Sequence, residues 1–362
     1  GSAHRSGPRG VHQRPLRRVT QTVDLTTDRF RGRRRWFGPL VTASLLAVAG
    51  AALSFGAVSV PGDQVLGVLA REFGMTAFAE PTQQAQAVVW GIRMPRLLLG
   101  FVVGASLAGV GGVLQGLLRN EMADPHLLGI GPGAAIGASI GSAVGGIPGA
   151  ISGGVVAGVV TAFAIRRLAS RASIDPTRII LSGVALGAAL SAWVGFVVFA
   201  ADRATVPPIE FWLLGSLTGS TWRALGTTTV FVVASGIVLL SSARTLDVLG
   251  LGESSARHLG MDVDLVRTVL LVSSGVAVGA TVGAVGVVAF VGLLVPYFAR
   301  KVAGPRHRHL LPASAAGGAL FVAASDLASR LVIEPIEIPV GLVTAAVGGP
   351  LFLWLLTRRR DA

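Results

Sequence analysis

The sequence has no cysteine, one tyrosine and one lysine, and only 14% of its 362 residues are charged. Without cysteine the chain can form neither disulfide bonds nor thiolate metal sites. Because the single lysine, Lys301, follows Arg300, the pattern G-x-x-x-x-G-K-[ST] of a P-loop cannot be written, so nucleotide energy must come from another chain. The charged fraction lies well below the roughly 25% of soluble domains, which excludes an ordinary cytosolic enzyme.

Long uncharged runs and glycine are abundant instead. Hydrophobic residues make up 52% of the chain, the mean hydropathy is +0.69 and there are 49 glycines. Since a helix needs about 20 apolar residues to cross a bilayer, the uncharged runs predict an all-α polytopic membrane protein. The longest run is divided by a turn signal at Gly145–Gly149. We therefore predict ten transmembrane helices, at residues 37–58, 96–117, 129–146, 149–168, 179–200, 222–242, 267–285, 289–302, 309–331 and 338–357.

The basic residues predict the orientation of these spans. Ten spans put both termini on one side, where 25 of the 31 Lys+Arg residues would lie. The positive-inside rule makes that side cytoplasmic, in a multi-pass protein of the plasma (inner) membrane. Residues 1–36 carry ten arginines, and we expect a disordered cytoplasmic tail there that touches membrane lipid, ahead of a transmembrane domain at 37–360. Since no folded basic domain accompanies this tail, we expect no nucleic-acid partner.

Small residues recur every four positions in the second and third predicted spans. This spacing places them on one helix face, where helix backbones can approach closely. We interpret both rows as packing seams inside one helical bundle. They are Gly100, Gly104, Ala108, Gly112 and Gly116 in the second span and Gly129, Gly133, Gly137, Gly141 and Gly145 in the third.

Ionisable groups are scarce at membrane depth, which argues against chemistry inside the bundle. Asp326 is the one such group well inside a predicted span, and its four-residue spacing from Arg330 is typical of a local charge pair. No catalytic set and no metal site is expected. Ion-coupled carriers hold ionisable groups at the midplane. A stand-alone ion-coupled secondary transporter remains the alternative to a subunit that is energised by another protein.

Eight segments occur in an order and spacing that resemble one known family. They are Ile92–Arg96, Leu114–Asn120, Ala123–Gly129, Leu181–Leu186, Phe211–Ser216, Leu251–Gly260, Phe290–Pro296 and Ile338–Thr344. The chain resembles the membrane subunit of type II ABC importers for ferric siderophores, haem and cobalamin, the FecCD-type permeases. The resemblance implies a ten-helix permease fold that imports a metal chelate, with a ferric siderophore as the expected cargo.

The same resemblance implies partners. These are a second permease subunit, identical or related, two ABC ATPase subunits and an extracytoplasmic substrate-binding protein. The permease chain would hold no cofactor of its own, because ATP and magnesium bind to the ATPase. The translocation pathway would lie at the interface of the permease dimer.

Individual residues receive roles from the resemblance, each beside a simpler interpretation. The cytoplasmic loop 244–267 would couple to the ATPase, although by itself Gly252–Gly260 is a short amphipathic helix with Ala256 and Leu259 opposite its polar side. Arginines outside the membrane would dock the binding protein, although snorkelling anchors would look the same. Trp193 would line the pathway, although a large aromatic also suits the bundle core. The residues concerned are Gly252, Glu253, Ala256, Arg257, Leu259 and Gly260 for coupling, Arg93, Arg96 and Arg330 for docking, and Thr177 and Trp193 for gate and pathway.

Overall fold

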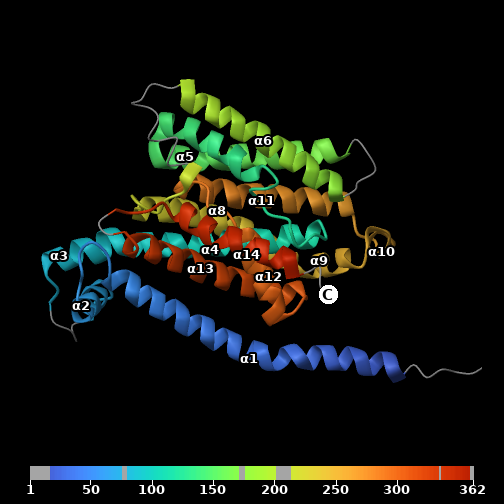
Figure 1. Cartoon of the computed structure of the whole chain (residues 1–362), viewed down its shortest axis with the longest axis horizontal. Coiled ribbons are helices and arrows are strands. Elements are labelled where there is room, and N and C mark those ends of the chain that lie inside the picture. Colours follow the sequence, from blue (N-terminus) through green and yellow to red (C-terminus); the bar gives the residue numbers. More distant parts are fainter. Residues whose placement is uncertain (1–16, 76–79, 171–175, 201–212, 334–335, 359–362) are drawn as a thin grey trace, which may run out of the picture.

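The computed structural model describes residues 17–75, 80–170, 176–200, 213–333 and 336–358, which form a bundle of helices (Figure 1). Helices α5 and α6 lie on one side, α8 and α11 follow, then α4 with α12, α13 and α14, and α1 lies on the opposite side. The elements are α1 (Arg17–Ser54), α2 (Gly62–Glu72), α3 (Gln83–Gln86), a π-helical segment (Ala87–Arg93), α4 (Met94–Leu117), α5 (Ile130–Ser170), α6 (Pro176–Ala200), α8 (Trp222–Ser241), α9 (Ala243–Gly250), α10 (Glu253–His258), α11 (Val263–Val285), α12 (Val291–Ala303), α13 (His307–Leu331) and α14 (Val340–Arg358).

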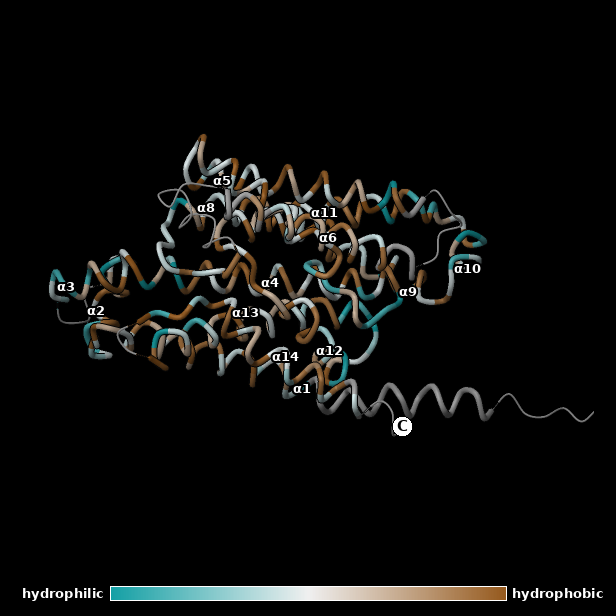
Figure 2. Tube along the Cα trace, turned by 45° about the horizontal axis from the view of Figure 1, so that its top comes forward, coloured by the Kyte–Doolittle hydropathy of each residue, from teal (hydrophilic) through white to brown (hydrophobic). Residues whose placement is uncertain are grey.

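Each predicted span coincides with one of these helices or with half of one. Among the described residues, six helical stretches are long and apolar enough to cross a membrane, and α6 and α14 contain shorter apolar stretches. Helix α12 has 13 residues, about 20 Å at 1.5 Å per residue, which is shorter than a bilayer core of about 30 Å. Hydrophobic residues follow the length of the bundle and hydrophilic ones gather at its ends (Figure 2). An all-helical membrane protein with several spans is confirmed, and ten crossings stay a prediction.

Helix α5 contains the turn that the sequence predicts at its middle. Gly145 and Gly146 depart from helical geometry, and Gly146 has φ 58° and ψ −142°, a conformation that side chains other than glycine rarely adopt. The two halves then pack against each other. A Cβ on Gly141 would overlap the carbonyl of Gly149, and one on Gly137 would overlap that of Gly153. The predicted seam of the third span is thus the contact between two antiparallel halves.

Backbone contacts through glycine also hold the longer helices together. A Cβ on Gly104 of α4 would overlap the carbonyl of Gly318 of α13, which confirms the predicted seam of the second span. Between α5 and α11, Gly154 meets Gly279 and Gly158 meets Gly275 in the same manner. Such contacts replace the hydrophobic driving force that helices lack in lipid.

The beginning of α1 differs from the sequence-based expectation. We expected disorder through residue 36, whereas α1 begins at Arg17. Pro15 precedes the helix and the next proline is Pro39, so no proline interrupts residues 17–36. The remainder of the expected tail, residues 1–16, lies outside the described residues.

Candidate docking, coupling and pathway sites

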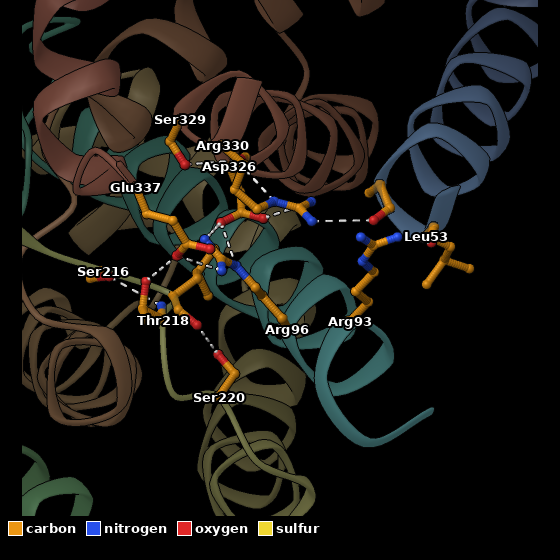
Figure 3. Close-up of polar contacts among 12 residues, drawn as sticks. Leu53, Arg93, Arg96, Ser216, Thr218, Ser220, Asp326, Ser329, Arg330 and Glu337 are labelled. Atoms are coloured by element: carbon orange, nitrogen blue, oxygen red, sulfur yellow. Dashed lines mark hydrogen bonds and ion pairs between the residues drawn. The ribbon is translucent and has the colours of Figure 1, made fainter. Parts of the chain in front are cut away.

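The arginines expected to dock a partner lie close together where α4 begins and α13 ends (Figure 3). Nε and Nη2 of Arg96 each lie 2.9 Å from Oδ1 of Asp326, and its Nη1 lies 2.9 Å from Oε2 of Glu337. Nη2 of Arg330 lies 3.2 Å from Oδ2 of Asp326, which confirms the predicted i,i+4 pair. Thr218 donates its hydroxyl proton to the same Glu337 oxygen at 2.7 Å. Segments far apart in sequence thus meet in one polar cluster.

The cluster extends to the end of α1 through backbone carbonyls. Arg93 donates from Nη1 to the carbonyl oxygen of Leu53 at 2.6 Å and from Nη2 to that of Val58. Arg330 donates from Nη1 to the carbonyl oxygen of Ala52 at 3.3 Å. The last carbonyls of a helix have no partner within that helix, so these arginines supply donors for the end of α1.

The three arginines expected to dock the binding protein are buried in this chain. Arg93, Arg96 and Arg330 are 6%, 7% and 8% exposed. A buried charge is tolerated when it is paired, and Asp326 and Glu337 supply the counter-charges from within the chain. The side chain of Glu337 is 38% exposed, so among the charged members of the cluster it is the one that a partner could reach most readily.

Glu337 is held in its charged form by its neighbours. Partial burial alone would raise the pKa of this carboxyl group, but the hydrogen bonds from Thr218 and Arg96 and the charges of Arg96 and Arg330 outweigh that effect. The pKa of Glu337 therefore lies below its ordinary value. Sequence reasoning missed Glu337 and Thr218, because nothing local in the sequence connects them to Arg96.

The predicted amphipathic helix in the loop 244–267 is present as α10. Gly252, with φ 111°, precedes it, and Gly260, with φ 82°, follows it, so the chain turns sharply at both ends. Ala256 is fully buried, as expected. Leu259, expected on the same side of the helix as Ala256, is 68% exposed. Leu259 is the C-cap of α10, and its N–H still donates to the carbonyl oxygen of Ser255 at 3.1 Å. The bundle therefore covers Ala256 and leaves Leu259 uncovered.

Two ion pairs fix α10 against α11. Arg257 lies 3.0 Å from Asp264 on the surface, and Arg267 contacts Glu253 from a buried position. Leu251 and Leu265, which flank this hairpin, are 70% and 59% exposed. With Leu259 they form a set of exposed leucines around α10, which we call the α10 leucines. Apolar residues exposed on a rigid, charged hairpin suit contact with another protein.

The proposed gate and pathway residues both lie on α6. Thr177 is the second residue of that helix, and its side chain is outside the described part. Trp193 is 57% exposed and stacks on Phe196 with ring centroids 5.8 Å apart. Because it is exposed, Trp193 does not belong to the core of this subunit's bundle, and it faces lipid, the pathway or another subunit.

Polar contacts inside the bundle join α4 to α12. Gln115 donates from Nε2 to the carbonyl oxygens of Gly292 and Leu293, at 3.3 and 3.1 Å. Arg300 contacts the other amide atom of Gln115 at 3.4 Å and Glu121 at 3.2 Å. Gln115 lies in the family-like segment Leu114–Asn120 and Glu121 directly follows it, but nothing in the sequence indicates Arg300 as their partner. Within the described ranges, no three His, Asp or Glu side chains gather as metal ligands.

Comparisons with known proteins agree with this architecture. Residues 43–358 match the model of the FecCD transport family. The chain is 41% identical over 292 residues to the cobalamin import system permease protein BtuC of Halobacterium salinarum, covering 78% of each chain. It is 35% identical over 308 residues to the hemin transport system permease protein HmuU of Yersinia pestis, covering 83% of this chain and 92% of HmuU.

A solved structure has the same fold. It is an inward-facing conformation described as a metal-chelate type ABC transporter, with a TM-score of 0.76 and 29% sequence identity. The match covers 88% of this chain and 97% of that one. A family match across nearly the whole membrane domain assigns this multi-pass chain to the permease subunits of ABC transporters, which are not themselves catalytic. The chain therefore belongs to the FecCD transport family.

Proposed function

We propose that this chain forms the membrane pathway of an ATP-driven importer whose cargo is a metal chelate of the cobalamin, haem or ferric siderophore class. The observation that carries the proposal is the family match over residues 43–358, supported by the likeness to a metal-chelate type transporter. The two relatives described above are named for cobalamin and hemin, and a ferric siderophore is the third chelate of this class. Family membership leaves no observation in favour of a stand-alone ion-coupled carrier.

The working complex contains two permease subunits, identical or related, two ATPase subunits and one binding protein. Exposed apolar side chains on α6 and α14 support a pathway between the permeases. Trp193 and Phe196 on α6 are 57% and 59% exposed, and Leu353 and Trp354 on α14 are 64% and 45% exposed. Of the 31 Lys+Arg residues, 25 would lie on the same side of the membrane as the two termini, and this excess supports cytoplasmic termini.

The hairpin of α10 and α11 is the proposed contact with the ATPase. Its coupling residues are Gly252, Glu253, Ala256, Arg257, Leu259 and Gly260. Ala256 anchors α10 in the bundle, and the ion pairs of Glu253 with Arg267 and of Arg257 with Asp264 connect α10 to α11. Movement of the ATPase subunits would then reach α11 directly, as a displacement of packed helices.

When the binding protein docks, one of its carboxylates replaces a carboxylate of the polar cluster. Three arginines face two carboxylates there, so the cluster keeps one uncompensated positive charge. Glu337 is the exposed carboxylate, and an acidic side chain of the binding protein would replace it at Arg96. Arg93, Arg96 and Arg330 thus act as charges under the surface, which orient the partner and raise its association rate.

Reconstitution tests the function directly. The permease is placed in proteoliposomes with its ATPase and its binding protein, and radiolabelled cyanocobalamin, haem and ferric siderophore are offered in turn. We expect ATP-dependent uptake of one chelate and none when the ATPase is omitted. Uptake that follows an ion gradient without ATPase would contradict the proposal.

A further inference from the structure

A cavity of about 260 Å³ lies among α4, α8, α11 and α13, away from the polar cluster and the α10 hairpin. Its lining is almost wholly apolar. Val233, Ile237 and Leu240 of α8 line it and are 53%, 65% and 49% exposed, so the cavity opens on the outer side of the bundle. Pockets for drug-sized ligands measure about 300–1,000 Å³, so this groove suits a slender apolar group and not a bulky chelate.

Two glycines give the groove its depth. Gly109 on α4 and Gly236 on α8 both line it, and a Cβ added to either would meet no atom within 4 Å. They differ in this from Gly104, whose Cβ would overlap a neighbouring helix. Glycine at these two positions therefore serves no close approach between helices and leaves space that an occupant can use.

The groove offers an occupant few free hydrogen-bonding groups. Ser235 donates its hydroxyl proton to the carbonyl oxygen of Phe231 in its own helix, at 2.7 Å. Ser106 is 8% exposed, and its Oγ has no hydrogen-bond partner among the described residues. A single hydroxyl cannot anchor a polar ligand of this size, so the lining favours a hydrocarbon occupant.

The groove lies toward one end of the membrane-spanning helices. Val113 is near the end of α4, Leu240 is the penultimate residue of α8 and Leu311 is the fifth residue of α13. The three helices therefore place it in the half of the bundle next to α9. At that depth the medium outside the protein is the acyl chains of one leaflet.

Two exposed arginines, Arg244 and Arg308, lie at the same end of the bundle. Asp247 of α9 accepts a hydrogen bond from the backbone of His307 at 3.0 Å and contacts its Nδ1 at 2.7 Å, which ties α9 to the start of α13. Arg244 lies one turn before Asp247, and Arg308 directly follows His307. Both arginines are exposed, and neither has an ion pair or hydrogen bond from its side chain within the described ranges.

Both arginines are also close in sequence to residues that line the groove. Arg308 precedes Leu311 by three residues on α13, and Arg244 follows Leu240 by four. Arg308 and Leu311 are three residues apart on the same helix, so they share a helix face. Arg244 is the second residue of α9, which begins directly after the end of α8 that lines the groove. We propose that this groove binds one acyl chain of an anionic phospholipid from the leaflet next to α9, with the phosphate held by Arg244 and Arg308.

Photolabelling of the full chain in proteoliposomes tests the acyl-chain site. The probe is phosphatidylglycerol with a diazirine on one acyl chain, and labelled peptides are identified by mass spectrometry. We expect labels on residues 105–113 of α4 and 232–240 of α8. The double variant Gly109→Leu, Gly236→Leu fills the groove and should lower this labelling about tenfold, because the leucines displace methylene groups from their contacts.

The control is Gly226→Leu, also on α8, where a Cβ meets no atom within 4 Å and which does not line the groove. Its labelling should equal that of the parent chain. Equal labelling of α4 and α8 in the filled variant and the parent would overturn the proposal. Thermal unfolding in detergent verifies that each variant is folded, and Gly109→Ala with Gly236→Ala provides a milder filling that should lower labelling less.

The headgroup is tested with phosphatidylcholine that carries the same acyl chain. We expect the anionic probe to label α8 more strongly than the zwitterionic one at low salt. The double variant Arg244→Gln, Arg308→Gln should remove that difference, whereas Arg223→Gln, at the other end of α8, should keep it. Equal labelling by both probes in the parent chain would overturn the role of the arginines.

Discussion

Arg96 and Asp326 are 230 residues apart in sequence, yet two nitrogens of the arginine lie 2.9 Å from one oxygen of the aspartate, and both side chains are buried. The contact joins the beginning of α4 to the end of α13. Since Arg330 shares Asp326, removal of this one carboxylate would leave two buried guanidinium groups without their principal counter-charge.

Asp326→Asn should therefore destabilise the protein strongly. Breaking a buried ion pair on one side costs about 3–5 kcal/mol, because the remaining charge stays buried. Thermal unfolding in detergent measures the effect, with Asp63→Asn, at an exposed position of α2, as the control. Combining Asp326→Asn with Arg96→Gln should cost less than the sum of the two changes, and strict additivity would contradict the coupling.

Acid should loosen the same cluster through Glu337. The pKa of Glu337 is lower in the folded protein than in the unfolded chain, where a glutamate has a pKa of about 4.3. Its contribution to stability is therefore complete above the unfolded pKa and is lost as the pH falls through the folded pKa. Unfolding temperatures of the parent chain and of Glu337→Gln should converge on acidification below about pH 4. A difference that stays constant across the titration would contradict this assignment.

Docking of the binding protein should respond in opposite directions to two substitutions. Arg96→Gln removes the positive charge beneath the surface and should weaken association at low salt, mainly through the on-rate. Glu337→Gln removes the competing carboxylate from Arg96 and should strengthen it. Surface plasmon resonance at two salt concentrations measures both, and Arg71→Gln, exposed on α2, is the control. If Glu337→Gln weakens docking, the proposed exchange is wrong.

Coupling should depend on the α10 leucines more than on the surface ion pair of the hairpin. Arg257 and Asp264 are 49% and 44% exposed, and exposed pairs contribute roughly 0–1 kcal/mol, so Arg257→Ala should leave stability almost unchanged. Leu259→Asp places a charge in the proposed interface and should prevent co-purification with the ATPase. Leu66→Asp, at a half-exposed position of α2, should leave co-purification intact. Retention of the ATPase by Leu259→Asp would refute the contact.

Glycine substitutions should separate close helix contacts from open positions. Gly104→Ala forces a methyl group into the backbone of Gly318 and should lower the unfolding temperature or abolish folding. Gly226→Ala meets open space inside α8 and should stabilise the helix slightly, by about 0.5–1 kcal/mol. Equal effects of the two substitutions would contradict the packing.

Features that depend only on residues close together in sequence were predicted from the spacing of those residues. The turn at Gly145 and Gly146, the seam of α4 and the pair of Asp326 with Arg330 all follow from periodicity or from turn chemistry within one segment. The family resemblance added the order of the segments and is confirmed by the family match.

Contacts between distant segments could not be predicted in this manner. Arg96 is buried because Asp326 and Glu337 lie beside it, and neither is near it in sequence. Ala256 is buried and Leu259 is exposed, a difference set by which segments pack against α10 and not by the helical period. Phe290, directly before α12, has a φ of 66°, a left-handed conformation that is uncommon outside glycine and that no sequence pattern indicated.

The contacts of Gly154 with Gly279 and Gly158 with Gly275 have a mechanical consequence. Side chains can change rotamer to absorb a small shift between helices, but two backbones in contact through glycine have no such freedom. A displacement of α11 toward α5 would therefore push directly on the backbone of α5. A movement that begins at α10 would then pass from α11 to α5 through backbone contacts, so these glycines, which add no functional group, would link the two helices mechanically.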